Sequence, residues 1–137
     1  MSQYMLLVYE EEVEPAAQAE RERQLPLFLE LHRSLRDAGL LVGVKALRST
    51  ESATSVRVRD GRTGVTDGPF AVTKEVLAGY YVLDCADLDE ALEHAARIPA
   101  AGWGTIEVRP VVPAEEFMET ARRAGAEVSD QDVRDMA

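Results

Sequence analysis

The first apolar stretch of the chain, residues 4–9, is apolar on both of its alternating faces. The two faces consist of Tyr4, Leu6 and Val8 and of Met5, Leu7 and Tyr9. A β-strand with apolar side chains on both faces is typically covered on both sides. The pattern therefore predicts a strand that needs packing against each face.

A helical pattern follows the acidic run Glu10–Glu14 and extends from Pro15 to Ala38. Within it, apolar side chains recur at helical spacing, at Leu25, Phe28, Leu31, Leu35 and Ala38. Because Pro26 lacks a backbone N–H and its ring crowds the preceding turn, we expect a kink or two helical pieces there. Gly39 is suited to the C-terminal cap.

The middle of the chain predicts short strands and a tight hairpin. Residues 40–47 form the first of these strands, and residues 54–59 alternate between valine and polar side chains. Asp60-Gly61 is typical of a two-residue hairpin turn, so residues 62–66 are expected to pair with 54–59. A stronger strand covers residues 77–84.

The remaining elements are a helix, a strand and a polar C-terminal segment. Asp87 begins a capping-box pattern, and the helix it opens ends near Ile98, before Pro99. Its predicted buried stripe consists of Leu88, Ala91, Leu92, Ala95 and Ala96. Residues 105–112 form the last strand, and an acidic helix over residues 114–124 and a loose tail follow.

This order predicts an α+β domain over residues 1–112, followed by an acidic C-terminal helix and tail over residues 113–137. Two β-α-β halves form a ferredoxin-like βαββαβ sheet with both helices on one face. The other face is apolar, and the polar C-terminal helix is poorly suited to cover it. We therefore expect a homodimer, a dimeric α/β barrel-like assembly formed through that face.

The composition narrows the class of protein. Acidic residues outnumber basic ones by 25 to 15, and the net charge is −10. This balance argues against nucleic-acid binding, which needs clustered basic side chains. Cys85 is the single cysteine, so no internal disulfide is expected. The sequence shows neither a secretory leader nor an apolar segment of membrane length, and we expect no membrane association and a cytoplasmic location.

Isolated reactive side chains give little support to a metal or nucleophilic site. His32 and His94 have no second His or Cys at ligand spacing, so each is interpreted as structural or surface, and no metal or other cofactor is expected. Asp84 and Asp87 flank Cys85 and oppose formation of its thiolate, which argues against a catalytic cysteine.

The segment Thr66–Glu75 is the most informative part of the sequence. Asp67-Gly68-Pro69 predicts a rigid turn that projects a carboxylate, and Phe70 supplies an apolar anchor. Lys74 lies just before a strand. By composition alone, the segment fits an Asx-type turn pinned by Phe70, with a surface ion pair worth at most about 1 kcal/mol.

Residues 67–75, DGPFAVTKE, are very similar to the DGPFAETKE signature of the DGPF group of YCII-related proteins, with Val72 in place of the signature's Glu. Further similarities follow in chain order at Asp37–Leu41, Val56–Gly61, Gly79–Val82, Asp87–Ala91, Ala96–Ala100 and Gly104–Pro110. The resemblance covers residues 3–112. It implies a dimeric ferredoxin-like α+β domain, as the hydrophobic pattern does.

The same resemblance implies a site. For the wider YCII group a His–Asp pair near the dimer cleft is proposed as an acid–base dyad, and Asp67 takes the position of its Asp. The histidine would lie near the start of the first helix, where this chain has Pro26–Leu29. His32 lies about one turn later, so the dyad is incomplete.

The first functional hypothesis is a cofactor-free small-molecule enzyme for proton transfer, elimination or isomerisation. Asp67 is its candidate catalytic acid or base, provided that burial brings the pKa of its carboxyl toward neutrality. Lys74 or Arg109 would orient an anionic or carbonyl group. The candidate substrate-binding residues are Phe70, Lys74, Tyr80, Tyr81 and Arg109.

Two alternatives remain open. The resemblance implies a non-catalytic regulatory or partner domain, because DGPF proteins are often encoded beside, or fused to, extracytoplasmic-function sigma factors. The acidic runs Glu10–Glu14 and Ala114–Ala124 would suit a basic protein partner. The third hypothesis is a cofactor-free ferredoxin-like oxygenase, which Trp103 and the tyrosines support only weakly because fold does not determine function.

Overall fold

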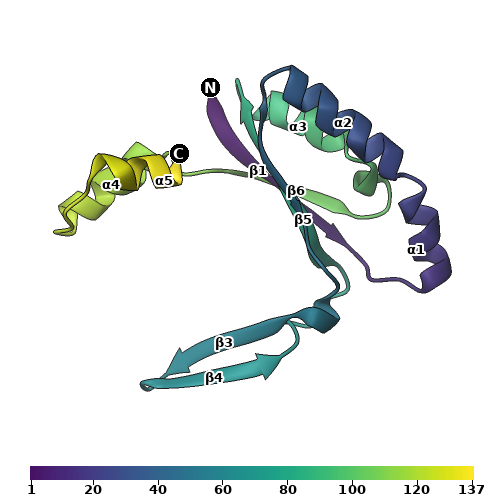
Figure 1. Ribbon diagram of the computed structural model, residues 1–137, viewed down its shortest axis with the longest axis horizontal. Helices are drawn as coiled ribbons and strands as arrows, with labels where there is room; N and C mark the ends of the chain where they lie inside the picture. The colour runs from purple at the N-terminus through teal and green to yellow at the C-terminus, as the bar shows by residue number, and fades with distance from the viewer.

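The computed structural model describes residues 1–137 and contains a four-stranded and a two-stranded sheet. The four-stranded sheet consists of β1 (Ser2–Glu10), β2 (Leu41–Ala46), β5 (Val76–Cys85) and β6 (Thr105–Pro110), in the order β2-β5-β1-β6. Every neighbouring pair is antiparallel. This mixed α+β arrangement is consistent with the expected ferredoxin-like fold (Figure 1).

Helices α1 (Pro15–Glu22), α2 (Leu25–Asp37) and α3 (Leu88–Arg97) lie on one side of this sheet (Figure 1). The expected interruption at Pro26 is confirmed, because α1 and α2 are separate helices. Pro26 lies in the first turn of α2, where a backbone N–H has no partner within the helix. No helix in the chain combines the length and the apolar character that crossing a membrane requires.

The predicted start of α3 is confirmed by its cap. The Asp87 carboxylate accepts a hydrogen bond from the Glu90 amide at 2.9 Å, and the Glu90 carboxylate accepts one from the Ala86 amide at 3.1 Å. The predicted buried stripe is only half right. Ala91 and Ala95 are buried, whereas Leu88, Leu92 and Ala96 are exposed. Small alanine side chains let the helix lie close to the sheet, which turns the leucines toward solvent.

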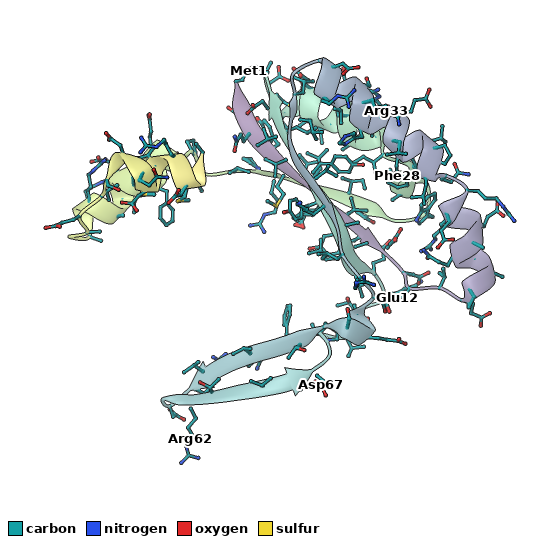
Figure 2. The ribbon with its side chains drawn as sticks, in the orientation of Figure 1. Met1, Glu12, Phe28, Arg33, Arg62 and Asp67 are labelled. Carbon is teal, nitrogen blue, oxygen red and sulfur yellow. The ribbon has the colours of Figure 1, made fainter.

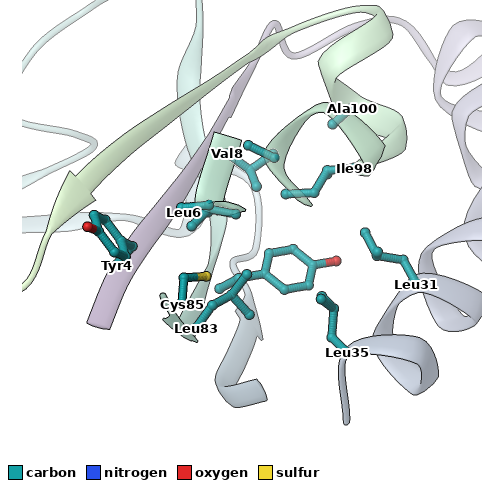
Figure 3. Close-up of a cluster of buried hydrophobic side chains, with 12 residues drawn as sticks. Tyr4, Leu6, Val8, Leu31, Leu35, Leu83, Cys85, Ile98 and Ala100 are labelled. Carbon is teal, nitrogen blue, oxygen red and sulfur yellow. The ribbon is translucent and has the colours of Figure 1, made fainter. Parts of the chain in front are cut away.

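The hydrophobic core lies between the sheet and helices α2 and α3 (Figure 3). The side chains sealed most completely are Leu6, Leu35, Leu83, Ile98 and Cys85. Each buried aliphatic side chain stabilises the fold by about 1.5–3 kcal/mol. A short 3-10 helix, η2 (Pro99–Gly102), follows α3 and closes one edge of the core with Ala100.

The hairpin predicted around Asp60-Gly61 is present as β3 (Thr54–Arg59) and β4 (Arg62–Asp67). Asp60 and Gly61 have φ angles of 52° and 72°, as a two-residue turn of this type requires. The hairpin pairs with no other strand and projects from the sheet (Figure 1), so we call residues 54–67 the hairpin arm. The 3-10 helix η1 (Thr50–Ser52) lies at its base.

The C-terminal segment forms two helices, α4 (Ala114–Arg123) and α5 (Asp130–Met136). The acidic helix expected over residues 114–124 is confirmed. The expected loose tail is wrong, because Ser129 and Asp132 form a capping box that begins α5. Helices α4 and α5 pack mainly against each other, and we call residues 114–136 the helical arm (Figure 1).

Candidate ligand-binding cleft

An open cleft of about 540 Å³ lies on the helical side of the sheet, between helices α1 and α2 and strands β1, β2 and β5. We call it the helix-face cleft. Its walls are mostly apolar and include Val8, Phe28, Leu29, Val44, Ala46 and Ala100. Sites that hold small organic molecules are typically apolar hollows of roughly 300–1,000 Å³ with a few polar groups. The helix-face cleft has this size and character.

Tyr81, on β5, supplies a polar group in the cleft wall. Its side chain is buried, with 5% of the residue exposed, and its hydroxyl forms no hydrogen bond with another protein group. No side-chain polar atom of the protein is both sealed from solvent and without a partner, so this hydroxyl retains some access to solvent. Burial raises the pKa of Tyr81. The phenol is therefore a neutral hydrogen-bond donor at physiological pH.

His32 is a second polar group in the cleft wall. It lies on α2, one turn after Phe28, and is half-buried. The imidazole makes neither a hydrogen bond nor an ion pair within the protein, so its ring nitrogens are available to a ligand. Sequence spacing assigned His32 to a structural or surface role. The fold instead brings it to the same hollow as Tyr81, which lies far away in sequence.

One end of the cleft is closed by a cluster of Glu10, Arg21 and Trp103. The Trp103 indole donates a hydrogen bond to the Glu10 carboxylate at 2.6 Å. The Arg21 guanidinium lies 3.8 Å from the same carboxylate and 5.6 Å from the centre of the Trp103 ring. Arg21 also donates to the Glu11 carbonyl at 2.6 Å. The charges of Glu10 and Arg21 therefore compensate each other. Tyr81 and His32, together with Gln18, Glu22 and Lys45 of the same lining, are the polar groups that remain without a side-chain partner.

The sequence offered no local signal for this cluster. Glu10 begins an acidic run, Arg21 lies in a helix with no buried residue, and Trp103 stands between two glycines. Their proximity depends on the loop that turns the chain from β1 into α1. Trp103 also packs against Phe28, with the ring centres 6.4 Å apart, and so links the cluster to the apolar wall.

Asp67 lies outside the helix-face cleft. It is the last residue of β4, pairs with Thr54 in the hairpin arm and is exposed (Figure 2). The turn after it is held by the Gly68 amide, which donates to the Ala53 carbonyl at 2.7 Å. Within one chain, the structure does not bring Asp67 together with Tyr81.

The other candidate residues are divided between separate surfaces. Phe70 is 80% exposed, and the Lys74 ammonium lies 3.5 Å from the Glu11 carboxylate at the surface. Tyr80 follows the alternation of β5, opposite in direction to the buried Tyr81, although it is also one of the residues that line the helix-face cleft. Arg109 pairs with Met5 across β1 and β6 on the face that carries no helix.

The signature segment lines a smaller hollow of about 480 Å³ at the base of the hairpin arm. Its walls include Tyr9, Pro69, Phe70, Ala71, Thr73 and Leu77. Asp67 is not among its lining residues, and no buried polar group points into it without a partner. This hollow therefore offers a ligand fewer defined polar contacts than the helix-face cleft does.

Cys85 is fully buried in the core. Burial is the main cause that raises the pKa of its thiol, and the carboxylates of Glu90, Asp84 and Asp87 add to the effect. The thiolate is therefore disfavoured, as the flanking acidic residues suggested. No group of three or more His, Cys, Asp or Glu side chains is arranged to hold a metal ion.

Comparison with known proteins identifies the family. A sequence profile of the YCII-related domain matches residues 2–115. A curated relative from Rhizobium meliloti (strain 1021), described as "Uncharacterized protein R00369", is 41% identical over 112 residues, which span 79% of this chain and 90% of the relative. The match includes the strands and helices that form the helix-face cleft. The chain belongs to the YCII-related domain family.

Proposed function

We propose that this protein binds a compact, largely apolar organic molecule that carries a hydrogen-bond acceptor, and that it does so in the helix-face cleft. The observation that carries the proposal is the Tyr81 hydroxyl, which sits in an apolar wall without a protein partner. Because the hydroxyl is accessible to solvent, an acceptor on a ligand would replace water as its partner, for a net gain of about 0.5–1.5 kcal/mol. A carbonyl or similar acceptor on a bound molecule would supply the missing partner.

The enzymatic form of this proposal is cofactor-free proton transfer, elimination or isomerisation. The His32 imidazole can accept or donate a proton, and the Tyr81 hydroxyl can stabilise negative charge that develops on a substrate oxygen. Asp67 would take part only where a second copy brings its hairpin arm to the site, since Asp67 is exposed on its own arm. An oxygenase activity would use the same cleft, with dioxygen as co-substrate.

The match to the DGPF signature at residues 67–75 supports assignment to that group within the family. A non-catalytic role, as a regulatory domain associated with an extracytoplasmic-function sigma factor, is the second proposal. The helical arm favours it, since this arm is acidic and exposes Phe117. Loss of sigma-factor binding when the helical arm is neutralised would support that role, and unchanged binding would contradict it.

The binding proposal is tested with the intrinsic fluorescence of Trp103, which is the single tryptophan of the chain and lines the cleft. The ligand used as a probe is 1-anilinonaphthalene-8-sulfonate, and its binding is followed as quenching of Trp103 emission. Ala46→Phe places a phenyl ring in the cleft from an exposed strand position. Ala17→Phe, at an exposed position of α1 that does not line the cleft, is the matched control. We expect saturable quenching in the wild type and in Ala17→Phe, and its loss in Ala46→Phe. Equal quenching in all three proteins would overturn the proposal.

The enzymatic form needs a separate test, because binding can persist without turnover. Wild type, His32→Gln and Asp67→Asn are compared for turnover of a panel of small carbonyl compounds. Loss of turnover in His32→Gln alone assigns the acid–base role to the cleft. Loss in Asp67→Asn assigns it to the signature residue, and absence of turnover by the wild type contradicts an enzymatic role toward this substrate class.

A further inference from the structure

Strand β3 has an open outer edge. The hairpin arm is a two-stranded sheet of its own, so β3 and β4 pair only with each other, and the arm projects away from the main sheet (Figure 1). Backbone groups that point outward from such an edge have no partner in the ladder. Because a two-stranded hairpin is at best marginally stable in water, a third strand added to this edge would stabilise the arm.

The register of the hairpin decides which backbone groups are free. Its two-residue turn is flanked by Arg59 and Arg62, which pair with each other. Hydrogen-bonded and non-hydrogen-bonded pairs alternate along an antiparallel ladder, so the N–H and carbonyl groups of Val56 and Val58 point outward from β3. In agreement with this direction, the Val58 carbonyl accepts a hydrogen bond from the Arg59 guanidinium at 3.0 Å. The outer edge therefore presents alternate donors and acceptors to an extended chain.

One face of the hairpin arm, which we call the arginine face, carries Arg57, Arg59 and Arg62 and contains no acidic residue. Arg62 lies at the tip of the arm and points away from the rest of the chain (Figure 2). Arg59 and Arg62 lie directly opposite each other, and like charges in this arrangement destabilise a sheet. None of the three arginines forms an ion pair. In a chain of net charge −10, this face is positive and has no carboxylate partner.

The alternation along β3 indicates which side chains an added strand would carry. Side chains on the same face of neighbouring strands lie beside each other. Acidic side chains of the added strand would therefore lie beside Arg57 and Arg59, and apolar ones beside Val56 and Val58, which are 62% and 57% exposed. A second copy of β3 would instead bring arginines together. A nucleic acid would meet the net negative charge of the chain and would leave the outward backbone groups unpaired.

We propose that the outer edge of β3 binds an extended segment of a partner protein in which acidic and apolar side chains alternate. The segment adds to the hairpin arm as a third strand, a mode in which main-chain hydrogen bonds supply affinity and alternate side chains supply specificity. Arg57 and Arg59 form charge-assisted hydrogen bonds with its carboxylates. This surface is separate from the helix-face cleft, so the inference does not depend on the binding function proposed there.

The test is the fluorescence anisotropy of a fluorescein-labelled peptide in which glutamate and valine alternate, titrated with the full chain. Arg57→Gln/Arg59→Gln removes the charges at exposed positions. Val58→Pro removes an outward N–H while the bonds to β4 stay in place, and Val58→Ala is its matched control. A peptide of the same composition with its glutamates grouped at one end tests the alternation.

We expect saturable binding of the alternating peptide by the wild type and by Val58→Ala. The dissociation constant should be at least about tenfold higher for Arg57→Gln/Arg59→Gln, for Val58→Pro and for the grouped peptide, with unchanged circular dichroism spectra. A wild type without saturable binding, equal binding of the two peptides, or undiminished binding by Val58→Pro would overturn the inference. Displacement of the peptide by an equal concentration of single-stranded oligothymidylate would assign the arginines to a nucleic acid and would also contradict it.

Discussion

The Trp103 indole donates a 2.6 Å hydrogen bond to the Glu10 carboxylate, and this bond joins the loop after η2 to the end of β1. Arg21 stacks beside the same indole and thereby connects α1 to the sheet. Helix α1 has no buried residue of its own. The cleft wall formed by α1 therefore depends on a polar cluster rather than on hydrophobic packing.

Arg21→Ala is expected to loosen α1 without unfolding the domain. The substitution removes the ion pair with Glu10, the contact with Trp103 and the hydrogen bond to the Glu11 carbonyl. Amide hydrogen exchange across α1 should become faster while exchange in β5 stays unchanged. Arg23→Ala is the control, because Arg23 is exposed and pairs only with Glu20. Equal acceleration in both variants would contradict the anchoring role.

Tyr81→Phe is expected to leave the free energy of unfolding at neutral pH unchanged within about 0.5 kcal/mol. A hydroxyl with a protein partner would contribute about 0.5–1.5 kcal/mol, but the Tyr81 hydroxyl has none. Chemical denaturation of the two proteins measures the difference. A loss of more than about 1 kcal/mol would show that the hydroxyl has a structural role.

The same variant is expected to differ from the wild type in alkaline solution. Burial raises the pKa of Tyr81 above the ordinary value of 10.0. The neutral phenol is therefore compatible with the fold below pH 10, and stability falls as the pH rises from there through the folded-state pKa. Wild-type protein should lose more stability than Tyr81→Phe above pH 10. Parallel curves of unfolding free energy against pH would contradict burial of the phenol.

Glu12→Gln is expected to destabilise the base of the hairpin arm in a pH-dependent way. The Glu12 carboxylate accepts hydrogen bonds from the Thr50 amide at 2.6 Å, the Thr50 hydroxyl at 2.9 Å and the Ser49 hydroxyl at 3.3 Å. The amide of Thr50 is the main cause that lowers the pKa of Glu12 below 4.5. Its stabilisation is thus present above pH 4.5 and is lost as the pH falls.

The difference in stability between the wild type and Glu12→Gln should therefore be largest near neutrality and shrink below pH 4.5. Thermal unfolding across an acidic pH series measures it. Glu14→Gln, two residues away and exposed, is the control. A difference that grows toward acid pH would show that Glu12 acts in another way.

Gly104→Ala is expected to be strongly destabilising, by about 2 kcal/mol or more. A Cβ atom at this position would overlap the Tyr9 carbonyl oxygen and crowd Glu10, and neither backbone segment can move without disturbing β1. Gly102→Ala is the matched control two residues earlier, where a Cβ would meet no atom within 4 Å. Similar unfolding midpoints for the two variants would contradict the close approach of these strands.

Local signals predicted much of the fold. The helix break near Pro26, the Asp87 cap and the turn at Asp60-Gly61 were predicted because each depends on the backbone chemistry of a few adjacent residues. Helix α5 was missed because it is short and polar, and its existence rests on the Ser129–Asp132 capping box. Leu88 and Leu92 were misplaced because helical spacing does not reveal which of two adjacent stripes faces the sheet.

The candidate site was less accessible to sequence reasoning. The sequence nominates Tyr81 as a candidate binding residue on a strong strand. That Tyr81 lines the same cleft as His32 and Trp103 depends on how β5, α2 and the loop after η2 meet in three dimensions. The DGPF signature nominates residues 67–75 as a functional segment, but it does not say where this segment lies relative to the cleft. Asp67 lies at the end of β4 on the hairpin arm, which forms a sheet of its own, and a short signature does not reveal that this arm projects away from the cleft.

The most direct test of the central claim compares ligands that differ only in a hydrogen-bond acceptor. Acetophenone and ethylbenzene are titrated into wild type and Tyr81→Phe, with Trp103 emission as the signal. We predict that the wild type binds acetophenone more tightly. Tyr81→Phe should lose that preference by about threefold to tenfold, the value of one hydrogen bond, with ethylbenzene unaffected. A wild type without saturable binding, or a preference that survives in Tyr81→Phe, would contradict the account.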